Sequence, residues 1–243
     1  NIVYLMISKE VVNALKLVAT EERRKVNEWF FKTGKGEYGY GDIFLGVTAP
    51  EIRRIAKKFS QEISLQELTE LIRSPIHEVR LCALIILVNK YKKEDRDKIY
   101  QYYLKHLNSV NNWDLVDTSA PHIVGDYLYN NPEKSKILLE FSHSENIWVR
   151  RISIVSTFTF IKNNEFNKTL EIAKLLLNDD HDLIHKAVGW MLREIYKRDE
   201  RLIKRFLRQN YAQIPRTTLR YAIERMDKEE RLLYLKGNFD VSH

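Results

Sequence analysis

Two segments decide the fold, DLIHKAVGWMLREIYKRD at Asp182–Asp199 and WVRRISIVSTFTFIK at Trp148–Lys162. In the second segment an apolar side chain recurs every three residues from Val149 to Phe158. That spacing places the apolar side chains on one face of a helix. Glycine and proline are rare, with eight and five residues in a chain of 243. Long stretches without these helix breakers also favour helices, so the sequence predicts an all-α protein.

Five amphipathic segments recur along the chain at a nearly constant spacing. Taking Leu81, Asp117, Arg151, Lys186 and Arg220 as equivalent positions gives successive steps of 36, 34, 35 and 34 residues. A shorter segment that favours helix lies between each pair of neighbours. Two helices in a unit of about 35 residues are typical of an α-solenoid, and the pairs are too irregular for the tetratricopeptide consensus. We therefore predict a single domain of HEAT-like helical repeats over residues 1–243.

Four of these five equivalent positions carry a charged residue where a core position would be apolar. Because charged side chains are seldom buried without partners, we expect all four to point away from the core along one face. A row of three cations and one carboxylate fits a phosphate backbone and one reactive group, although a solvated helix face is the alternative. The net charge of +7 also favours a polyanionic partner.

Tryptophan side chains lie about one helical turn from the same charged positions. An aromatic residue at helical spacing usually packs into a core. Aromatic rings interleaved with cations nevertheless provide the base stacking and phosphate contacts that nucleic-acid binding needs. The pairs are Trp113 with Asp117, Trp148 with Arg151, and Trp190 with both Lys186 and Arg193.

Two further motifs match known patterns without the required context. Gly34–Gly39 fits GxGxxG, but a helical stretch rather than a strand precedes it, so we predict a mobile basic loop and no dinucleotide site. His181, Asp182 and His185 could bind a metal, but the usual spacings and a further ligand are missing. We expect His181 and Asp182 to cap a helix, and we predict neither a metal nor a cofactor.

Cysteine use and hydropathy indicate the compartment. The single cysteine, Cys82, lies in the apolar run Leu81–Val88 and is expected to be a core thiol. No apolar stretch has the length of a membrane span, and the start of the sequence lacks the pattern of a signal peptide. We expect a soluble, monomeric, cytoplasmic protein without membrane contacts, associated with the nucleoid of a bacterium.

Five ordered motifs together resemble the AlkD-type DNA alkylation repair family. The resemblance extends from about residue 25 to residue 230. It implies a C-shaped superhelix of HEAT-like helix pairs that holds duplex DNA against a basic concave face. It also implies excision of N3- and N7-alkylated purines without base flipping and without a metal. The motifs are FFKTGKGEYGYGDIFLGV, NNWDLVDTSAPHIVGDYL, WVRRISIVSTFTFIK, DLIHKAVGWMLREIYKRD and PRTTLRYAIER.

The resemblance assigns catalytic roles to particular residues. NWDLVD matches the family's catalytic carboxylate at Asp117 and its first tryptophan at Trp113, and GWMLRE matches the second tryptophan at Trp190. The family also has an aromatic residue near the lesion on an N-terminal helix. For that role the candidates are Trp29, Phe30 and Phe31.

DNA binding is assigned partly by the resemblance and partly by the repeat pattern. GWMLRE and WVRR match the family's DNA-contacting arginines at Arg193 and Arg151. The repeat pattern adds Lys186, Trp148 and Arg220 to the predicted DNA-binding residues.

The chemistry of these residues fits glycosidic bond cleavage. N3- or N7-alkylation leaves the base cationic, and positive charge develops on the deoxyribose as the base departs. A carboxylate beside that sugar stabilises the transition state, and indole faces add cation–π attraction. We predict a monofunctional DNA glycosylase that releases 3-methyladenine and 7-methylguanine from duplex DNA in base excision repair. The alternatives are a non-catalytic HEAT-repeat binder of branched or damaged DNA and a protein-interaction scaffold.

Overall fold

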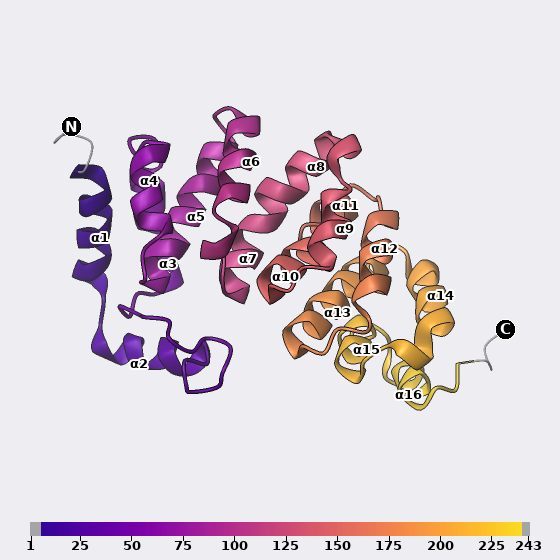
Figure 1. Cartoon of the computed structure of the whole chain (residues 1–243). Coiled ribbons are helices and arrows are strands. Elements are labelled where there is room, and N and C mark those ends of the chain that lie inside the picture. Colours follow the sequence, from indigo (N-terminus) through magenta and orange to yellow (C-terminus); the bar gives the residue numbers. More distant parts are fainter. Residues whose placement is uncertain (1–5, 240–243) are drawn as a thin grey trace. The chain divides into compact units, whose positions relative to one another are not determined.

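The computed structural model describes residues 6–239, and these are helical almost throughout (Figure 1). The one extended pairing within this range is an isolated parallel bridge between Ile43 and Ile76. The chain forms two compact units, one ending at Ser119 and the other beginning at Ala120. The predicted all-α fold is confirmed. The single domain over residues 1–243, the C-shaped superhelix and its basic concave face stay predictions.

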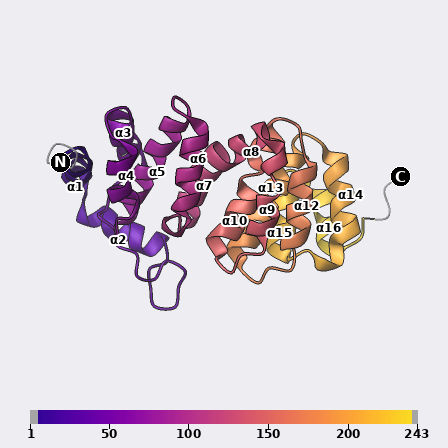
Figure 2. The same ribbon diagram turned by 45° about the horizontal axis from the view of Figure 1, so that its top comes forward.

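Between residues 6 and 120 the structure has the helices α1 to α7 and one 3₁₀ turn, and these make up the described part of the first unit. Helix α5 contacts α1, α3, α4 and α6, and α1 also packs against α3 and α4. Figures 1 and 2 both show α2 and the loop after it at one end of this unit. The bounds are α1 Met6–Val18, α2 Glu21–Phe30, α3 Ala49–Phe59, α4 Leu65–Ile72, α5 His77–Tyr91, α6 Arg96–Lys105, η2 Leu107–Ser109 and α7 Trp113–Ala120.

Helix α5 is the centre of the first unit. Its apolar run Leu81–Val88 is apolar on every face, and a helix of that kind is stable only when neighbours surround it. All eight of these side chains are buried. Cys82 is among them, which confirms the predicted core thiol, and burial raises the pKa of this thiol to about 12. The thiol is therefore protonated and unreactive at neutral pH.

The second unit continues from α7 through a π-helical turn that begins with Pro121. Helix α13 contacts α10, α11, α12, α14 and α15. The bounds are η3 Pro121–Gly125, α8 Asp126–Asn130, η4 Pro132–Lys134, α9 Ile137–Ser142, α10 Ile147–Val155, α11 Phe158–Lys162, α12 Asn167–Leu176, α13 Asp182–Tyr196, α14 Glu200–Asn210, η5 Tyr211–Gln213, α15 Arg216–Ala222 and α16 Lys228–Lys236.

Close packing of α13 on α15 depends on Gly189. A Cβ atom at this position would lie 2.5 Å from Cβ of Tyr221 and 2.8 Å from the carbonyl oxygen of Thr218. Those distances are too short for real contacts, so the two helices approach as they do because residue 189 has no side chain. In the described part of the chain, no helix is long and apolar enough to cross a membrane.

The predicted repeat register agrees with the observed helices. Each of the five equivalent positions lies on a separate helix, namely α5, α7, α10, α13 and α15. The shorter predicted segments between them correspond to α6, α9, α12 and α14. The HEAT-like alternation of helices is therefore present along both units.

Candidate active site

The loop between α2 and α3 is fixed to the start of α5 by a buried carboxylate. Glu78 is 1% exposed and accepts hydrogen bonds from the backbone N–H groups of Leu45 at 2.9 Å, Gly46 at 2.6 Å and Val47 at 3.0 Å. The side-chain amide of Asn27 on α2 also donates to it at 3.3 Å. Such charge-assisted hydrogen bonds satisfy both the carboxylate and the loop amides. Glu78 thereby sets the path of the loop.

Glycine is required where this loop approaches α2. Gly46 has a φ of +97°, in the left-handed region that favours glycine. A Cβ atom there would collide with the carbonyl oxygen of Thr20. The same carbonyl accepts the N–H of Arg24, and Gly46 itself accepts the N–H of Thr20 at 3.0 Å. The predicted basic loop is thus packed against α2 at its C-terminal end.

A histidine with two carboxylate partners joins this loop to α5 and α7. His77 is 1% exposed and hydrogen-bonds Asp42 of the loop through Nδ1 and Asp114 of α7 through Nε2, both at 2.7 Å. Arg80, one turn along α5, donates to the other oxygen of Asp42 at 2.9 Å and to the carbonyl of Ser74 at 3.0 Å. The loop and the first turn of α7 are therefore held by one polar network.

The network keeps His77 protonated. Burial lowers the pKa of the imidazole, but the adjacent carboxylates of Asp114 and Asp42 raise it more strongly, to about 9. For Asp42, burial raises the carboxyl pKa, while the hydrogen bond from His77 and the charge of Arg80 lower it below its usual value. At neutral pH an imidazolium therefore donates to two carboxylates.

We expect this network to make the stability of the first unit depend on pH. Below pH 6.5 the ring is protonated in the folded and the unfolded chain, and the stabilisation is complete. As the pH rises to 9 the unfolded chain loses the proton first, so about 3 kcal/mol of stability disappears. Urea unfolding at pH 6 and pH 9.5 measures this loss. A His77→Gln variant should lose much less stability over the same interval, and an equal loss in both proteins would contradict the assignment.

Aromatic rings stack beside the network. Phe31 stacks on Trp113 with ring centroids 5.4 Å apart and on Phe44 at 5.2 Å. Phe30 meets the Trp113 ring edge-on at 5.8 Å, and Phe44 stacks on His77 at 4.6 Å. Rings from α2, the loop, α5 and α7 thus form one aromatic cluster.

A cavity of about 300 Å³ opens beside this cluster, within the first unit. The residues that line it include three aromatic ones, Phe30, Phe31 and Trp113. They also include one acidic residue of α7, Asp117. Trp113 and Asp117 are both half-buried and lie four residues apart on α7, as the spacing predicted. We call this cavity the aromatic pocket. Its further polar lining includes Arg23, Arg53, Asp114 and Thr118.

The three N-terminal aromatic candidates, Trp29, Phe30 and Phe31, differ in whether they line the aromatic pocket. Phe30 and Phe31 line the aromatic pocket and contact Trp113. Trp29 is 72% exposed, and the ammonium group of Lys32 lies 5.1 Å from its ring centroid. The aromatic pocket therefore includes Phe30 and Phe31, and Trp29 is not among its lining residues.

The remaining predicted residues lie in the second unit. Trp190 packs against Phe158 with ring centroids 5.8 Å apart. Arg193 pairs with Glu224, and its guanidinium lies 5.8 Å from the ring of Tyr221. Three further basic residues were predicted to bind DNA, namely Lys186, Arg220 and Arg151, and the side chains of the first two are at least partly exposed to solvent. Lys186 pairs with Asp182 at 3.1 Å, and Arg220 is exposed.

Arg151 differs from the expectation that the charged repeated positions point away from the core. Arg151 is only 6% exposed and donates to the carbonyl oxygen of Leu183 at 2.6 Å. Trp148 is buried as well. The physical reason is the start of α13, which offers Arg151 a backbone acceptor within the fold. Exposure of this arginine was predicted wrongly, and its predicted contact with DNA stays a prediction.

The histidine motif behaves as a cap. His181 precedes α13 and accepts the N–H of Leu183 at 3.1 Å, which confirms its predicted capping role. Asp182 pairs with Lys186 and accepts the hydroxyl of Thr217 at 3.1 Å, so it links α13 to α15 instead of capping.

The repeat pattern and the motifs of the sequence do not predict the polar network of Asp42, His77, Glu78, Arg80 and Asp114. The letters HEVR before the apolar run of α5 have the form of an ordinary solvated helix start. A signal was nevertheless present, because three of the four residues that immediately precede the eight apolar ones are polar, in a helix that is buried on every side. Polar residues in a helix that is buried on every side are buried too, and they need hydrogen-bond or ion-pair partners.

The fold and the site define a class, a protein of HEAT-like helical repeats with an aromatic pocket and a carboxylate in its first unit. A family profile described as DNA alkylation repair enzyme matches residues 11–226. The chain therefore belongs to the DNA alkylation repair enzyme family. No curated protein matches the sequence.

Three of the solved structures of similar fold come from two bacteria. A predicted DNA alkylation repair enzyme from Enterococcus faecalis is 16% identical, with 86% of this chain and 97% of that chain covered and a TM-score of 0.71. AlkD2 from Streptococcus mutans is 17% identical, with 91% and 99% covered and a TM-score of 0.54. The protein smu.31 from Streptococcus mutans UA159 is 19% identical, with 91% and 100% covered and a TM-score of 0.53. At these identities the likeness concerns the fold.

Proposed function

We propose that this protein is a monofunctional DNA glycosylase that hydrolyses the N-glycosidic bond of cationic N3- and N7-alkylated purines in duplex DNA. The observation that carries the proposal is the aromatic pocket, in which the carboxylate of Asp117 and the stacked rings of Phe31 and Trp113 line one hollow. Membership of a DNA alkylation repair family supports the choice of substrate. We also propose that the protein acts as a monomer in the cytoplasm without a metal or cofactor.

The reaction needs little acid catalysis because the leaving group is already cationic. The C1′–N bond breaks and its electron pair passes to the alkylated base, which leaves as a neutral molecule. The positive charge moves to the deoxyribose as an oxocarbenium ion. Asp117 stabilises this charge and orients a water, whose oxygen bonds to C1′ while its proton is released to solvent. The products are the free base and an abasic site.

The aromatic rings contribute through their negative faces. A cationic base or the developing sugar cation beside Trp113, Phe30 or Phe31 gains cation–π attraction of roughly 0.5 to 2 kcal/mol per ring. In the second unit, Trp190 is proposed to act in the same way. Phosphate contacts are proposed for the basic residues of that unit and Trp148 beside them, namely Arg151, Arg193, Lys186 and Arg220.

We expect excision to depend on the charge of the damaged base. Duplexes carrying one 7-methylguanine should yield an abasic site, which alkali converts to a strand break. A matched duplex with a neutral lesion such as uracil should stay intact, because no side chain in the aromatic pocket is assigned to protonate a neutral leaving group. Equal cleavage of both duplexes would contradict the mechanism. Tight binding without cleavage of either would favour a non-catalytic binder of damaged DNA.

A further inference from the structure

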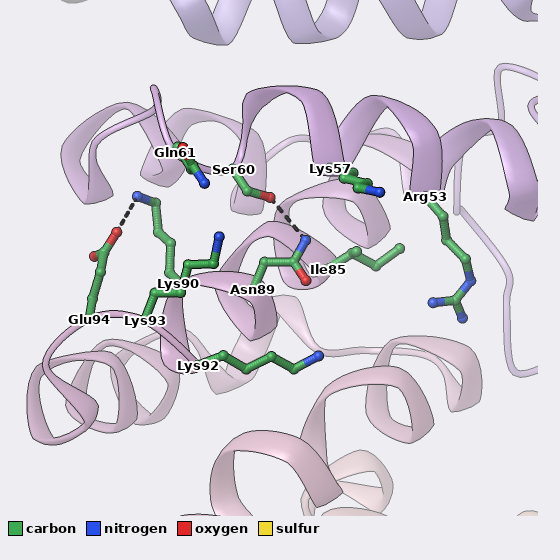
Figure 3. Close-up of a pocket in the computed structure, with 10 residues that line it drawn as sticks. All are labelled: Arg53, Lys57, Ser60, Gln61, Ile85, Asn89, Lys90, Lys92, Lys93 and Glu94. Carbon is green, nitrogen blue, oxygen red and sulfur yellow. Dashed lines mark hydrogen bonds and ion pairs between the residues drawn. The ribbon is translucent and has the colours of Figure 1, made fainter.

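A second cavity of about 550 Å³ lies in the first unit between α3 and the C-terminal end of α5. We call it the lysine hollow. Figure 3 shows Arg53 and Lys57 on α3 and the lysines that follow along α5 and its end around the same space. Five cationic side chains and one carboxylate are among the ten residues that line it. The charged residues are Arg53, Lys57, Lys90, Lys92, Lys93 and Glu94.

Only one of these cations is neutralised within the hollow. Lys90 is 4% exposed and pairs with Glu94 at 2.9 Å, as Figure 3 shows. The other four cations are exposed and have no hydrogen bond, ion pair or ring contact with any residue between 6 and 239. Elsewhere in this unit Arg24 and Arg54 pair with nearby glutamates. The lysine hollow therefore carries an uncompensated positive charge.

The floor of the hollow supplies no further negative charge. Asn89 donates to the hydroxyl of Ser60 at 2.9 Å, and that hydroxyl lies 2.5 Å from the carbonyl oxygen of Ala56. These neutral groups satisfy one another and fix the floor. An anion that enters the hollow would meet four free cations without displacing an internal partner.

The lysine hollow is next to the aromatic pocket. Arg53 and Ile85 line both cavities, one from α3 and one from α5. A polyanion with one unit in the aromatic pocket would therefore continue over these two residues into the hollow. The four cations are spread over a helix face and a turn and do not converge on one point. This arrangement suits a run of phosphates better than one free anion.

We propose that the lysine hollow binds phosphodiester groups of the DNA next to the base in the aromatic pocket. The inference rests on the proposed function for the identity of that neighbouring base. Ammonium and guanidinium groups contact phosphate oxygens without reading sequence, so the hollow positions the duplex and does not select the lesion. Binding releases condensed counterions, so each phosphate contact steepens the salt dependence of the affinity.

The test measures how the affinity of the double variant Lys57→Gln/Lys92→Gln for duplex DNA depends on the salt concentration. For an unmodified duplex, log affinity against log salt should have a slope shallower by about 1 to 2 than that of the full-charge protein. At about 0.1 M salt the affinity should fall on the order of tenfold or more. The matched control is Lys98→Gln/Lys105→Gln, which removes two exposed lysines from α6 of the same unit and should leave the slope unchanged. Circular dichroism of both double variants serves as the control for correct folding.

The outcomes separate this inference from the proposed function. An unchanged slope in Lys57→Gln/Lys92→Gln, or an equal change in the control, overturns the lysine hollow as a DNA contact even if methylpurines are released. A shallower slope with no base release by any protein supports the hollow and overturns the glycosylase. Millimolar inorganic phosphate at constant ionic strength should not compete with DNA. Competition would show a site for a free anion instead.

Discussion

Asp117→Asn should lower the rate of 7-methylguanine excision by about 10²- to 10³-fold, equivalent to about 3 to 4 kcal/mol in the barrier. Asparagine keeps the size of the side chain and most of its hydrogen bonding, but it removes the negative charge that faces the developing sugar cation. Binding of the intact DNA, before the glycosidic bond breaks, does not depend on this negative charge. A carboxylate near a phosphate backbone opposes binding, so affinity for duplex DNA should be unchanged or slightly higher.

This split between rate and affinity distinguishes catalysis from folding. Single-turnover excision and equilibrium binding are measured on the same duplex, with thermal unfolding as the control for structure. Thr118→Ala is the matched variant, because Thr118 also lines the aromatic pocket but carries no charge. It should retain most of the activity. A wild-type rate in Asp117→Asn would make the carboxylate structural and the mechanism wrong.

Glu78→Ala should destabilise the first unit by about 3 to 5 kcal/mol. The substitution leaves the N–H groups of Leu45, Gly46 and Val47 without their acceptor, and Gly46 and Val47 are buried. Each unsatisfied buried donor costs about 1 to 3 kcal/mol unless the loop moves to solvent. The loop should therefore detach from α5, and the ring of Phe44 should leave the aromatic cluster with it.

Hydrogen exchange gives the local readout for Glu78. In the wild-type protein the amides of residues 45–47 should exchange slowly, and in Glu78→Ala they should exchange at the rate of an open loop. Glu62→Ala removes an exposed glutamate from the same unit and should change stability by less than about 0.5 kcal/mol. Protected amides in Glu78→Ala would show that other contacts fix the loop.

The helical repeat and part of the site could be predicted because they depend on local spacing. The positions Asp117, Lys186 and Arg220 were found from a step of about 35 residues, and they lie on α7, α13 and α15. Trp113 and Asp117 were placed on one face by their separation of four residues, and both line the aromatic pocket. These relations lie within one helix or between equivalent helices.

The polar network depends on contacts between distant segments, so spacing did not reveal it. Asp42 reaches His77 from a position 35 residues earlier, and Asp114 reaches it from 37 residues later. The approach of Asp42 depends on the path of the loop, which Gly46 and Glu78 determine. No periodicity in the sequence describes that path.

Arg151 shows the limit of the repeat alignment. The alignment identified an equivalent helix position, and Arg151 does lie on a helix, α10. It could not indicate that the backbone carbonyl of Leu183 lies within reach of the guanidinium. An acceptor on a neighbouring helix turns an apparently exposed cation into a buried one.

The most direct test of the account is the release of free base from methylated duplex DNA, identified by mass spectrometry. The wild-type protein should release 7-methylguanine and 3-methyladenine and leave an abasic site in an intact strand, and Asp117→Asn should release neither at a comparable rate. Wild-type protein that binds the duplex but releases no methylated purine would contradict the account.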